Sequence, residues 1–247
     1  MFREKQMLVK PGEEYPIPSI DTNVQKLPVI FCVDVSGSMS SEIAKINQAI
    51  NKMIDDIKSD SVASRQVETC FVSFNDNATL IQNWKPITET DYAEYCASGC
   101  TNLEAGLSLA LEKSIERSRY YESFGMNVRM PFLIIITDGH SNGPDFSSIC
   151  SKIRERENKG KLRPFTIAVT GYDKNTVAQL SAGERVLEFV DPVEHNYMEF
   201  FNFMTQSLKA LSTSSLGENV TVDSNLGDVS KGSNMQIPNL PGTKWLN

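Results

Sequence analysis

Residues 29–40 have the sequence VIFCVDVSGSMS, which is the most informative pattern in the chain. Residues 29–33 are all apolar, which predicts a strand buried on both faces, and this run ends abruptly at Asp34. Two hydroxyl groups follow at alternate positions, on Ser36 and Ser38, with a glycine between them that allows a sharp backbone turn. Such a loop would bring three oxygen atoms to one point, and hard divalent cations such as Mg²⁺ prefer oxygen ligands. The stretch therefore predicts a metal site near the start of the chain.

Length, charge and hydropathy restrict the class of protein. The chain has 247 residues, enough for one sizeable domain with tails, and its 24 basic and 31 acidic residues give a net charge of −7. Nucleic-acid binding needs a basic surface, so this composition argues against it. No apolar run approaches the roughly 18 residues of a membrane span, and residues 1–18 contain no apolar core like that of a signal peptide. We expect a cytoplasmic protein whose partners include neither nucleic acid nor a membrane.

The five cysteines are expected to be reduced and mostly structural. Three of them lie in apolar patterns typical of strands or a helix: Cys32, Cys70 and Cys150. Cys96 and Cys100 form the only close pair, and both histidines of the chain are far from that pair in sequence, which argues against a zinc site. An odd number of cysteines without a secretory signal also argues against a disulfide framework. A redox pair at Cys96 and Cys100 is the alternative.

Apolar strand patterns and amphipathic helix patterns alternate along the chain. Strands are predicted at residues 27–33, 67–74, 78–84, 131–137, 163–170 and 186–190. Helical apolar stripes are predicted within residues 43–57, 103–115, 149–153, 175–180 and 200–211, and a polar loop at residues 118–129. The short turn at residues 75–77 implies an antiparallel hairpin, whereas the other connections are long crossovers typical of parallel strands. We predict a Rossmann-like, doubly wound α/β fold, whose mostly parallel sheet has one antiparallel edge strand and helices on both faces.

The same patterns suggest three parts of the chain. Residues 1–26 are expected to be an extended lead-in, because three prolines there prevent a continuous helix. Residues 27–212 are expected to form the ordered domain. Residues 213–247 are rich in Ser, Gly, Asn and Asp, and we expect a weakly ordered tail.

Oxygen-bearing side chains stand at the ends of three expected elements that are far apart in sequence. Asp34 and Asp138 each end an apolar strand, and Thr101 stands just before a predicted helix. Ligands of open parallel sheets bind beyond the carboxyl ends of the strands, so these side chains are expected to meet there. Taken singly, each segment also matches an ordinary helix cap or turn. Because all three segments place oxygen-bearing side chains at the same expected edge of the sheet, a metal site is favoured over three unrelated turns.

This order of residues, an Asp-x-Ser-x-Ser motif followed by a later Thr and a later Asp, resembles the von Willebrand factor A family. That family carries a metal-ion-dependent adhesion site, or MIDAS, built from these groups, and the resemblance covers most of the chain. It implies that Ser36, Ser38 and Thr101 supply hydroxyl oxygens to a metal. It also implies that Asp34 and Asp138 supply carboxylates, directly or through water. The resemblance thus predicts the fold of that family with an intact MIDAS.

Three functions are compatible with a metal site of this kind. The first is a protein-binding module without catalysis: two carboxylates and neutral hydroxyls leave a dication electrophilic, and an open position accepts an Asp or Glu of a partner protein. The second is a phosphoryl-transfer enzyme that uses Asp34, but such phosphatases need a second carboxylate where this chain has Ser36. The third is a scaffold without metal, against which the complete ligand set argues. We predict the non-enzymatic binding module, with Mg²⁺ bound and with Mn²⁺ or Ca²⁺ as alternatives.

Local features narrow the resemblance further, to bacterial tellurium-resistance proteins of the TerY type that consist of this single domain. The features are the approach to the motif at residues 27–39, the hairpin turn at residues 75–77 and the insertion at residues 118–129. This resemblance implies association with a protein kinase and a PP2C-like phosphatase in a stress-response system, for metal stress or phage defence.

Overall fold

The computed structural model of the protein describes residues 24–126, 128–169, 171–191, 195–215, 218, 220, 222 and 225–238. The predicted extended lead-in lies almost entirely outside these described residues. No helix within them combines the length and apolar character needed to cross a membrane.

A seven-stranded sheet forms the centre of the protein, with the order β3-β2-β1-β4-β5-β6-β7. Its strands are β1 (Leu27–Asp34), β2 (Val67–Phe74), β3 (Ala78–Pro86), β4 (Phe132–Thr137), β5 (Arg163–Ala168), β6 (Val186–Phe189) and β7 (Met235–Gln236). The five strands from β2 to β6 in this order are parallel to one another, and β3 pairs antiparallel with β2 at one edge. The predicted fold class is therefore confirmed.

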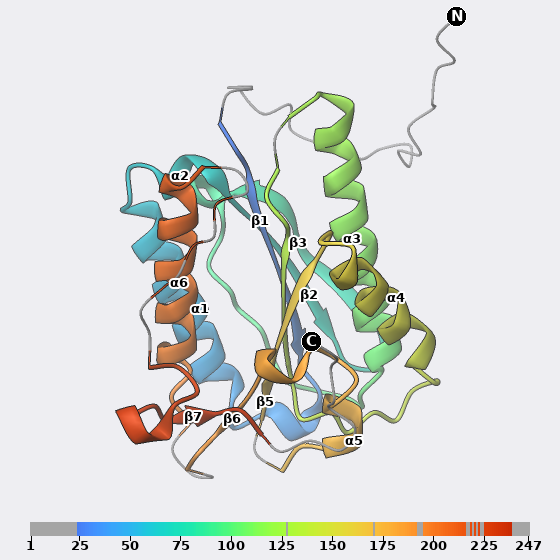
Figure 1. The fold of residues 1–247 in the computed structure, drawn as a ribbon. Helices are drawn as coiled ribbons and strands as arrows, with labels where there is room; N and C mark the ends of the chain where they lie inside the picture. Colours follow the sequence, from blue (N-terminus) through green and yellow to red (C-terminus); the bar gives the residue numbers. More distant parts are fainter. Residues whose placement is uncertain are drawn as a thin grey trace, which may run out of the picture.

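Helices cover both faces of the sheet. They are α1 (Ile43–Lys58), α2 (Ala63–Gln66), α3 (Leu103–Ser123), α4 (Ser147–Asn158), α5 (Lys174–Val177) and α6 (Met198–Thr213). Figure 1 shows α1, α2 and α6 on one face and α3, α4 and α5 on the other.

The sequence of β1 is apolar at every position before Asp34 because the strand is buried on both faces of the sheet. Phe31 and Val33 belong to the core between the sheet and α1 and α6, whereas Ile30 and Cys32 belong to the core on the side of α3 and α4. Each of these four side chains is fully buried. Because successive residues of a strand point to opposite faces, a strand covered by helices on both sides must be apolar at every position.

Two elements differ from the sequence-based expectations. Helix α3 continues to Ser123 through part of the expected loop at residues 118–129. The polar sequence predicted a loop here, but Arg117 and Tyr121 are buried by tertiary contacts, and such contacts override local sequence preference.

The second difference lies in the expected tail at residues 213–247, which contains β7. This strand pairs antiparallel with β6 and adds a second antiparallel edge that the sequence did not predict. Its one apolar anchor is Met235, which is fully buried in the core on the α6 side. One methionine in a polar segment gives no periodic signal from which a strand could be predicted.

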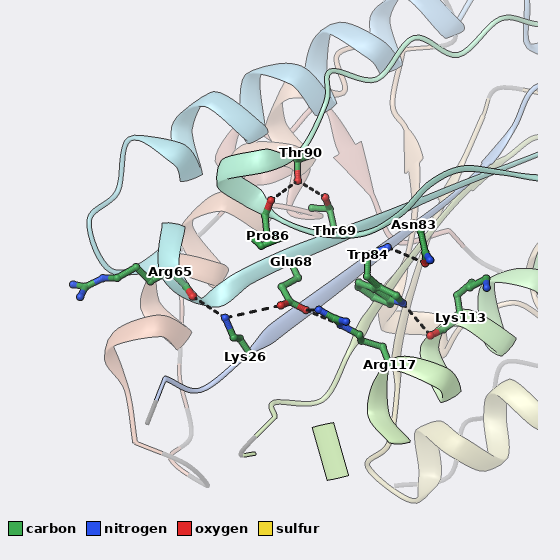
Figure 2. A network of polar contacts seen from close by, with 10 residues as sticks. All are labelled: Lys26, Arg65, Glu68, Thr69, Asn83, Trp84, Pro86, Thr90, Lys113 and Arg117. Carbon is green, nitrogen blue, oxygen red and sulfur yellow. Dashed lines mark hydrogen bonds and ion pairs between the residues drawn. The ribbon is translucent and has the colours of Figure 1, made fainter. Parts of the chain in front are cut away.

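A buried ion pair joins strand and helix at the end of the sheet where β1 and β2 begin (Figure 2). Glu68, the second residue of β2, is 1% exposed, accepts a hydrogen bond from Nε of Arg117 at 2.9 Å and forms an ion pair with Nη2 of Arg117 at 2.8 Å. Nζ of Lys26 approaches the other carboxylate oxygen to 3.9 Å. The Arg117 guanidinium also lies over the rings of Trp84 and Tyr121, 5.8 and 4.6 Å from their centroids. These contacts connect α3 to β2 and β3.

Replacing Arg117 by methionine is expected to destabilise the protein by about 3–5 kcal/mol, because it leaves the Glu68 carboxylate buried without its main partner. Urea denaturation followed by circular dichroism measures the change. Lys159→Met is the control: it breaks an exposed ion pair with Glu155 and should cost less than about 1 kcal/mol. If the two substitutions cost the same, Glu68 does not depend on Arg117.

Candidate metal centre

The predicted site residues stand at the edge of the sheet where the parallel strands end. Asp34 is the last residue of β1, and Asp138 directly follows β4, its neighbour in the sheet. The chain leaves β1 toward β2 on one side, and β4 lies on the other side, so the strand order reverses here. Thr101 stands two residues before α3. This is the position at which open α/β sheets bind ligands.

The carboxylate of Asp34 is held by two hydrogen bonds and is completely buried. Oδ1 accepts from the backbone N–H of Ser36 at 2.9 Å, and Oδ2 accepts from the hydroxyl of Thr137 at 2.7 Å. Burial raises the pKa of Asp34, the two hydrogen bonds lower it, and the charge of Asp138 adds to the increase, with a net upward shift. The site therefore contains a carboxylate whose negative charge is only partly compensated by the described residues.

The two serines of the motif present their hydroxyl oxygens side by side. The Oγ atoms of Ser36 and Ser38 are 3.1 Å apart; Ser36 is buried and Ser38 is exposed. Adjacent ligands of an octahedral Mg²⁺ ion, each about 2.1 Å from the metal, would be about 3.0 Å apart. The spacing of the two hydroxyls therefore fits neighbouring positions around such an ion.

Backbone hydrogen bonds join this loop to the loop that carries Thr101. The amide of Gly37 donates to the carbonyl of Gly99 at 2.9 Å, and the amide of Ser98 donates to the carbonyl of Val35 at 2.7 Å. Gly99 has a φ of +76°, and a Cβ atom there would lie 2.2 Å from a carboxylate oxygen of Asp76. The positive φ favours glycine at this position, so the hydrogen-bonded loop depends on Gly99.

The Thr101 loop is joined in turn to the segment after β4. The carbonyl of Thr101 accepts from the amides of Asn142 and Gly143 at 2.8 and 3.1 Å. Asp138 is 5% exposed, and its Oδ1 accepts from the amide of His140 at 3.0 Å. The three loops that carry the five predicted ligands are thus joined by hydrogen bonds at one end of the sheet.

The donor set of these loops consists of two carboxylates and three hydroxyls, on Asp34, Asp138, Ser36, Ser38 and Thr101. Within the described part of the chain, no group of three or more His, Cys, Asp or Glu side chains could hold a metal ion. A metal at this edge would therefore depend on hydroxyl oxygens as well as carboxylates. Such neutral and anionic oxygen donors fit a hard dication.

Two further residues, Thr137 in the site and Glu42 just after the serine loop, were not predicted from the sequence. Thr137 donates to Asp34 and accepts from the amide of Gly139 at 2.9 Å, so it orients both the carboxylate and the turn after β4. The pairing of Val33 with Ile136 places Thr137 beside Asp34, and this register was the missing information.

Glu42 is the second residue. Its Oε2 lies 2.7 Å from Nδ1 of His195 and accepts from the hydroxyl of Tyr197 at 3.0 Å. Burial alone would raise the pKa of Glu42, but these contacts outweigh it and hold the pKa below its usual range. The carboxylate connects the start of α1, four residues after Ser38, to the segment that leads into α6. Glu42 and His195 are 153 positions apart, so no local sequence pattern could indicate this contact.

Comparison with known proteins places the chain in a family. The family model of the von Willebrand factor type A domain matches residues 29–210. The chain therefore belongs to this family. No curated protein matches the chain.

Solved structures with the same fold come from varied sources. The pilus adhesin SpaC from Lactobacillus rhamnosus GG has a TM-score of 0.60 at 11% identity, and the match covers 76% of this chain and 30% of that one. A von Willebrand factor type A protein from Catenulispora acidiphila has a TM-score of 0.54 at 16% identity, with 76% and 43% covered. Proximal thread matrix protein 1 from the mussel byssus, described with a zinc-occupied MIDAS motif, has a TM-score of 0.53 at 18% identity, with 76% and 46% covered. The match thus spans less than half of each of these three proteins, and at these identities it establishes the fold alone.

Burial of the ionised Asp34 carboxylate is expected to lower the free energy of unfolding when no metal is bound. In the presence of EDTA at about pH 7, Asp34→Asn is expected to be more stable than the wild type, because the amide avoids the cost of an ionised buried group. Asparagine can keep both hydrogen bonds: its amide oxygen can accept from the Ser36 amide, and its NH₂ group can donate to the Thr137 hydroxyl, which accepts as well as donates. The folded-state pKa of Asp34 is raised, so the cost is absent below the unfolded-state pKa of about 3.9 and grows as the pH rises through the folded-state value.

Denaturant unfolding of both proteins across this pH range checks the prediction. The difference in stability should increase with pH. An Asp34→Asn protein that is equally stable or less stable at about pH 7 would contradict it.

Proposed function

We propose that the chain is a divalent-metal-dependent protein-binding module of the von Willebrand factor type A family. The observation that carries this proposal is the set of two carboxylates and three hydroxyls on three loops joined by hydrogen bonds at the strand ends. The neighbouring structures support it, because one is a pilus adhesin and another is described with a zinc-occupied MIDAS motif.

In this proposal Ser36, Ser38 and Thr101 hold the metal through their hydroxyl oxygens. Both oxygens of Asp34 already accept hydrogen bonds, so Asp34 acts through its remaining lone pairs or through a bridging water. Asp138 supplies the second negative charge. The bound dication supplies an electrophilic centre with a position open to a carboxylate. Thr137 keeps the Asp34 carboxylate aligned.

The partner in this proposal is a protein that presents an Asp or Glu side chain. Mg²⁺ is the proposed ion because of the hard oxygen donors, and Mn²⁺ or Ca²⁺ accept the same ligands. A phosphoryl-transfer reaction at Asp34 is not favoured, because the second residue after it is Ser36, whose amide supports Asp34 and whose side chain cannot act as a general acid. A calorimetric titration with Mg²⁺ and Mn²⁺ distinguishes this proposal from a metal-free scaffold, because a scaffold of that kind would bind neither ion.

The cellular setting rests on the sequence resemblance to TerY-type proteins. From it we propose a cytoplasmic adaptor in a stress-response or tellurium-resistance system, with a protein kinase or a PP2C-like phosphatase as the partner. Capture of such a partner from the native host in the presence of Mg²⁺, and its loss with EDTA, tests this assignment.

Substitution of a carboxylate ligand is expected to remove metal binding. Loss of an outer-sphere partner of a metal site typically costs about 10–100-fold in affinity, so Asp138→Ala should reduce Mn²⁺ affinity by at least about 100-fold. Isothermal titration calorimetry measures the affinity, and circular dichroism verifies the fold.

The matched control is Asp145→Ala. Asp145 is exposed a few residues further along the same loop, where its carboxylate bonds to Ser147. This variant should bind Mn²⁺ like the wild type. Equal affinities for all three proteins would contradict the assignment of Asp138 as a ligand.

A further inference from the structure

The described cysteines fall into two groups of different chemical character. Cys32, Cys70 and Cys150 are buried. Burial raises the pKa of Cys70 to about 12 and that of Cys150 to about 11, and it raises the pKa of Cys32 further. Thiol–disulfide exchange requires the thiolate, so these three thiols are inert near neutral pH.

Cys96 and Cys100 are instead exposed, and both are free thiols. They lie on one loop, in a segment without helix or strand, and Cys100 immediately precedes Thr101. An accessible thiol with a second thiol nearby in the same loop is the arrangement in which a mixed disulfide can be resolved within the chain. Their exposure therefore separates them from the other cysteines as a site of modification.

The segment between these two cysteines joins the Asp-x-Ser-x-Ser loop to the loop that carries Thr101. The amide of Ser98 donates to the carbonyl of Val35, and the carbonyl of Gly99 accepts from the amide of Gly37. Nδ2 of Asn75 also donates to the carbonyl of Ser98 at 3.1 Å. The structure with both thiols free is thus the one in which Ser98 and Gly99 fix the Asp-x-Ser-x-Ser loop.

A disulfide across this segment would constrain the same backbone atoms. It limits the separation of the two Cα atoms to about 4.4–6.8 Å and closes a small ring around Ser98 and Gly99. Gly99, inside this ring, has a φ of +76°, so the hydrogen-bonded loop depends on a backbone conformation that the ring is expected to disturb. The ring would therefore change the geometry of the two backbone hydrogen bonds to Val35 and Gly37.

We propose that Cys96 and Cys100 are a thiol modification site whose oxidation to a disulfide weakens metal binding at the adjacent loops. The effect on the metal rests on the proposed function, whereas the disulfide and its effect on the loops do not.

The co-reactant is a low-molecular-weight disulfide such as oxidised glutathione. One cysteine thiolate attacks a sulfur of this disulfide, forms a mixed disulfide and releases one glutathione thiolate. The second thiolate attacks the protein sulfur, forms the Sγ–Sγ bond and releases the second glutathione, and each protein thiol has lost its proton.

The full chain is tested in reduced form, after treatment with oxidised glutathione and after re-reduction with dithiothreitol. Peptide mass spectrometry should find a Cys96–Cys100 disulfide that lacks two hydrogen atoms, with Cys32, Cys70 and Cys150 unmodified. Calorimetry with Mn²⁺ should show an affinity lower by roughly tenfold or more, as expected for the loss of about two backbone hydrogen bonds, and re-reduction should restore it. The matched control is the double variant Cys96→Ser with Cys100→Ser, whose affinity should not respond to the oxidant.

Amide hydrogen exchange of Gly37 and Ser98 gives a measurement that needs no metal. Both amides should exchange faster in the oxidised protein than in the reduced protein. In the double variant, their exchange rates should not change after treatment with the oxidant. If the reduced protein binds no Mn²⁺ at all, the proposed function is wrong, and the exchange measurement still decides this inference. The inference is overturned if the oxidant leaves Cys96 and Cys100 unlinked, or if the disulfide forms and neither amide exchange nor Mn²⁺ affinity changes.

Discussion

The buried carboxylate of Asp34 is the feature on which the rest of the site depends. It stands at the end of a strand that helices cover on both faces, and it accepts from Ser36 within its own loop and from Thr137 on the neighbouring strand. These two bonds fix the start of the serine loop and the end of β4 relative to each other. Burial of the charge has a cost that the hydrogen bonds only partly offset, as the raised pKa of Asp34 indicates. A dication beside Asp34 would compensate that cost, so folding and metal binding are expected to be coupled.

Two polar clusters lie at opposite ends of the sheet, and they have different consequences. Where β1 and β2 begin, Glu68 is matched by Arg117, so this end needs no ligand to satisfy its charge. Where β1 and β4 end, Asp34 and Asp138 come close enough for the charge of one to raise the pKa of the other. The matched end serves the stability of the fold. The unmatched end is the one at which we propose a cation.

Most of the fold could be predicted from the sequence because it depends on local patterns. The apolar run before Asp34 indicates a strand between two layers of helices, and long crossovers then require parallel neighbours. Parallel strands end at the same edge, which is why Asp34 and Asp138 could be assigned to one site. Contacts that depend on register or on a single side chain could not be predicted. The bond from Thr137 to Asp34 requires knowledge of strand register, and β7 depends on the burial of Met235 alone.

We propose that the loop after β1, the loop after β4 and the loop before α3 together hold a divalent cation. A crystal structure of the chain grown with Mn²⁺ can locate this ion, because the anomalous scattering of manganese identifies it independently of any assumption about its ligands. We expect one anomalous peak within bonding distance of the hydroxyl oxygens of Ser36, Ser38 and Thr101, with Asp34 and Asp138 reaching the ion directly or through water. If the site is fully formed but has no peak, or if the peak lies elsewhere on the protein, these loops do not form the metal site.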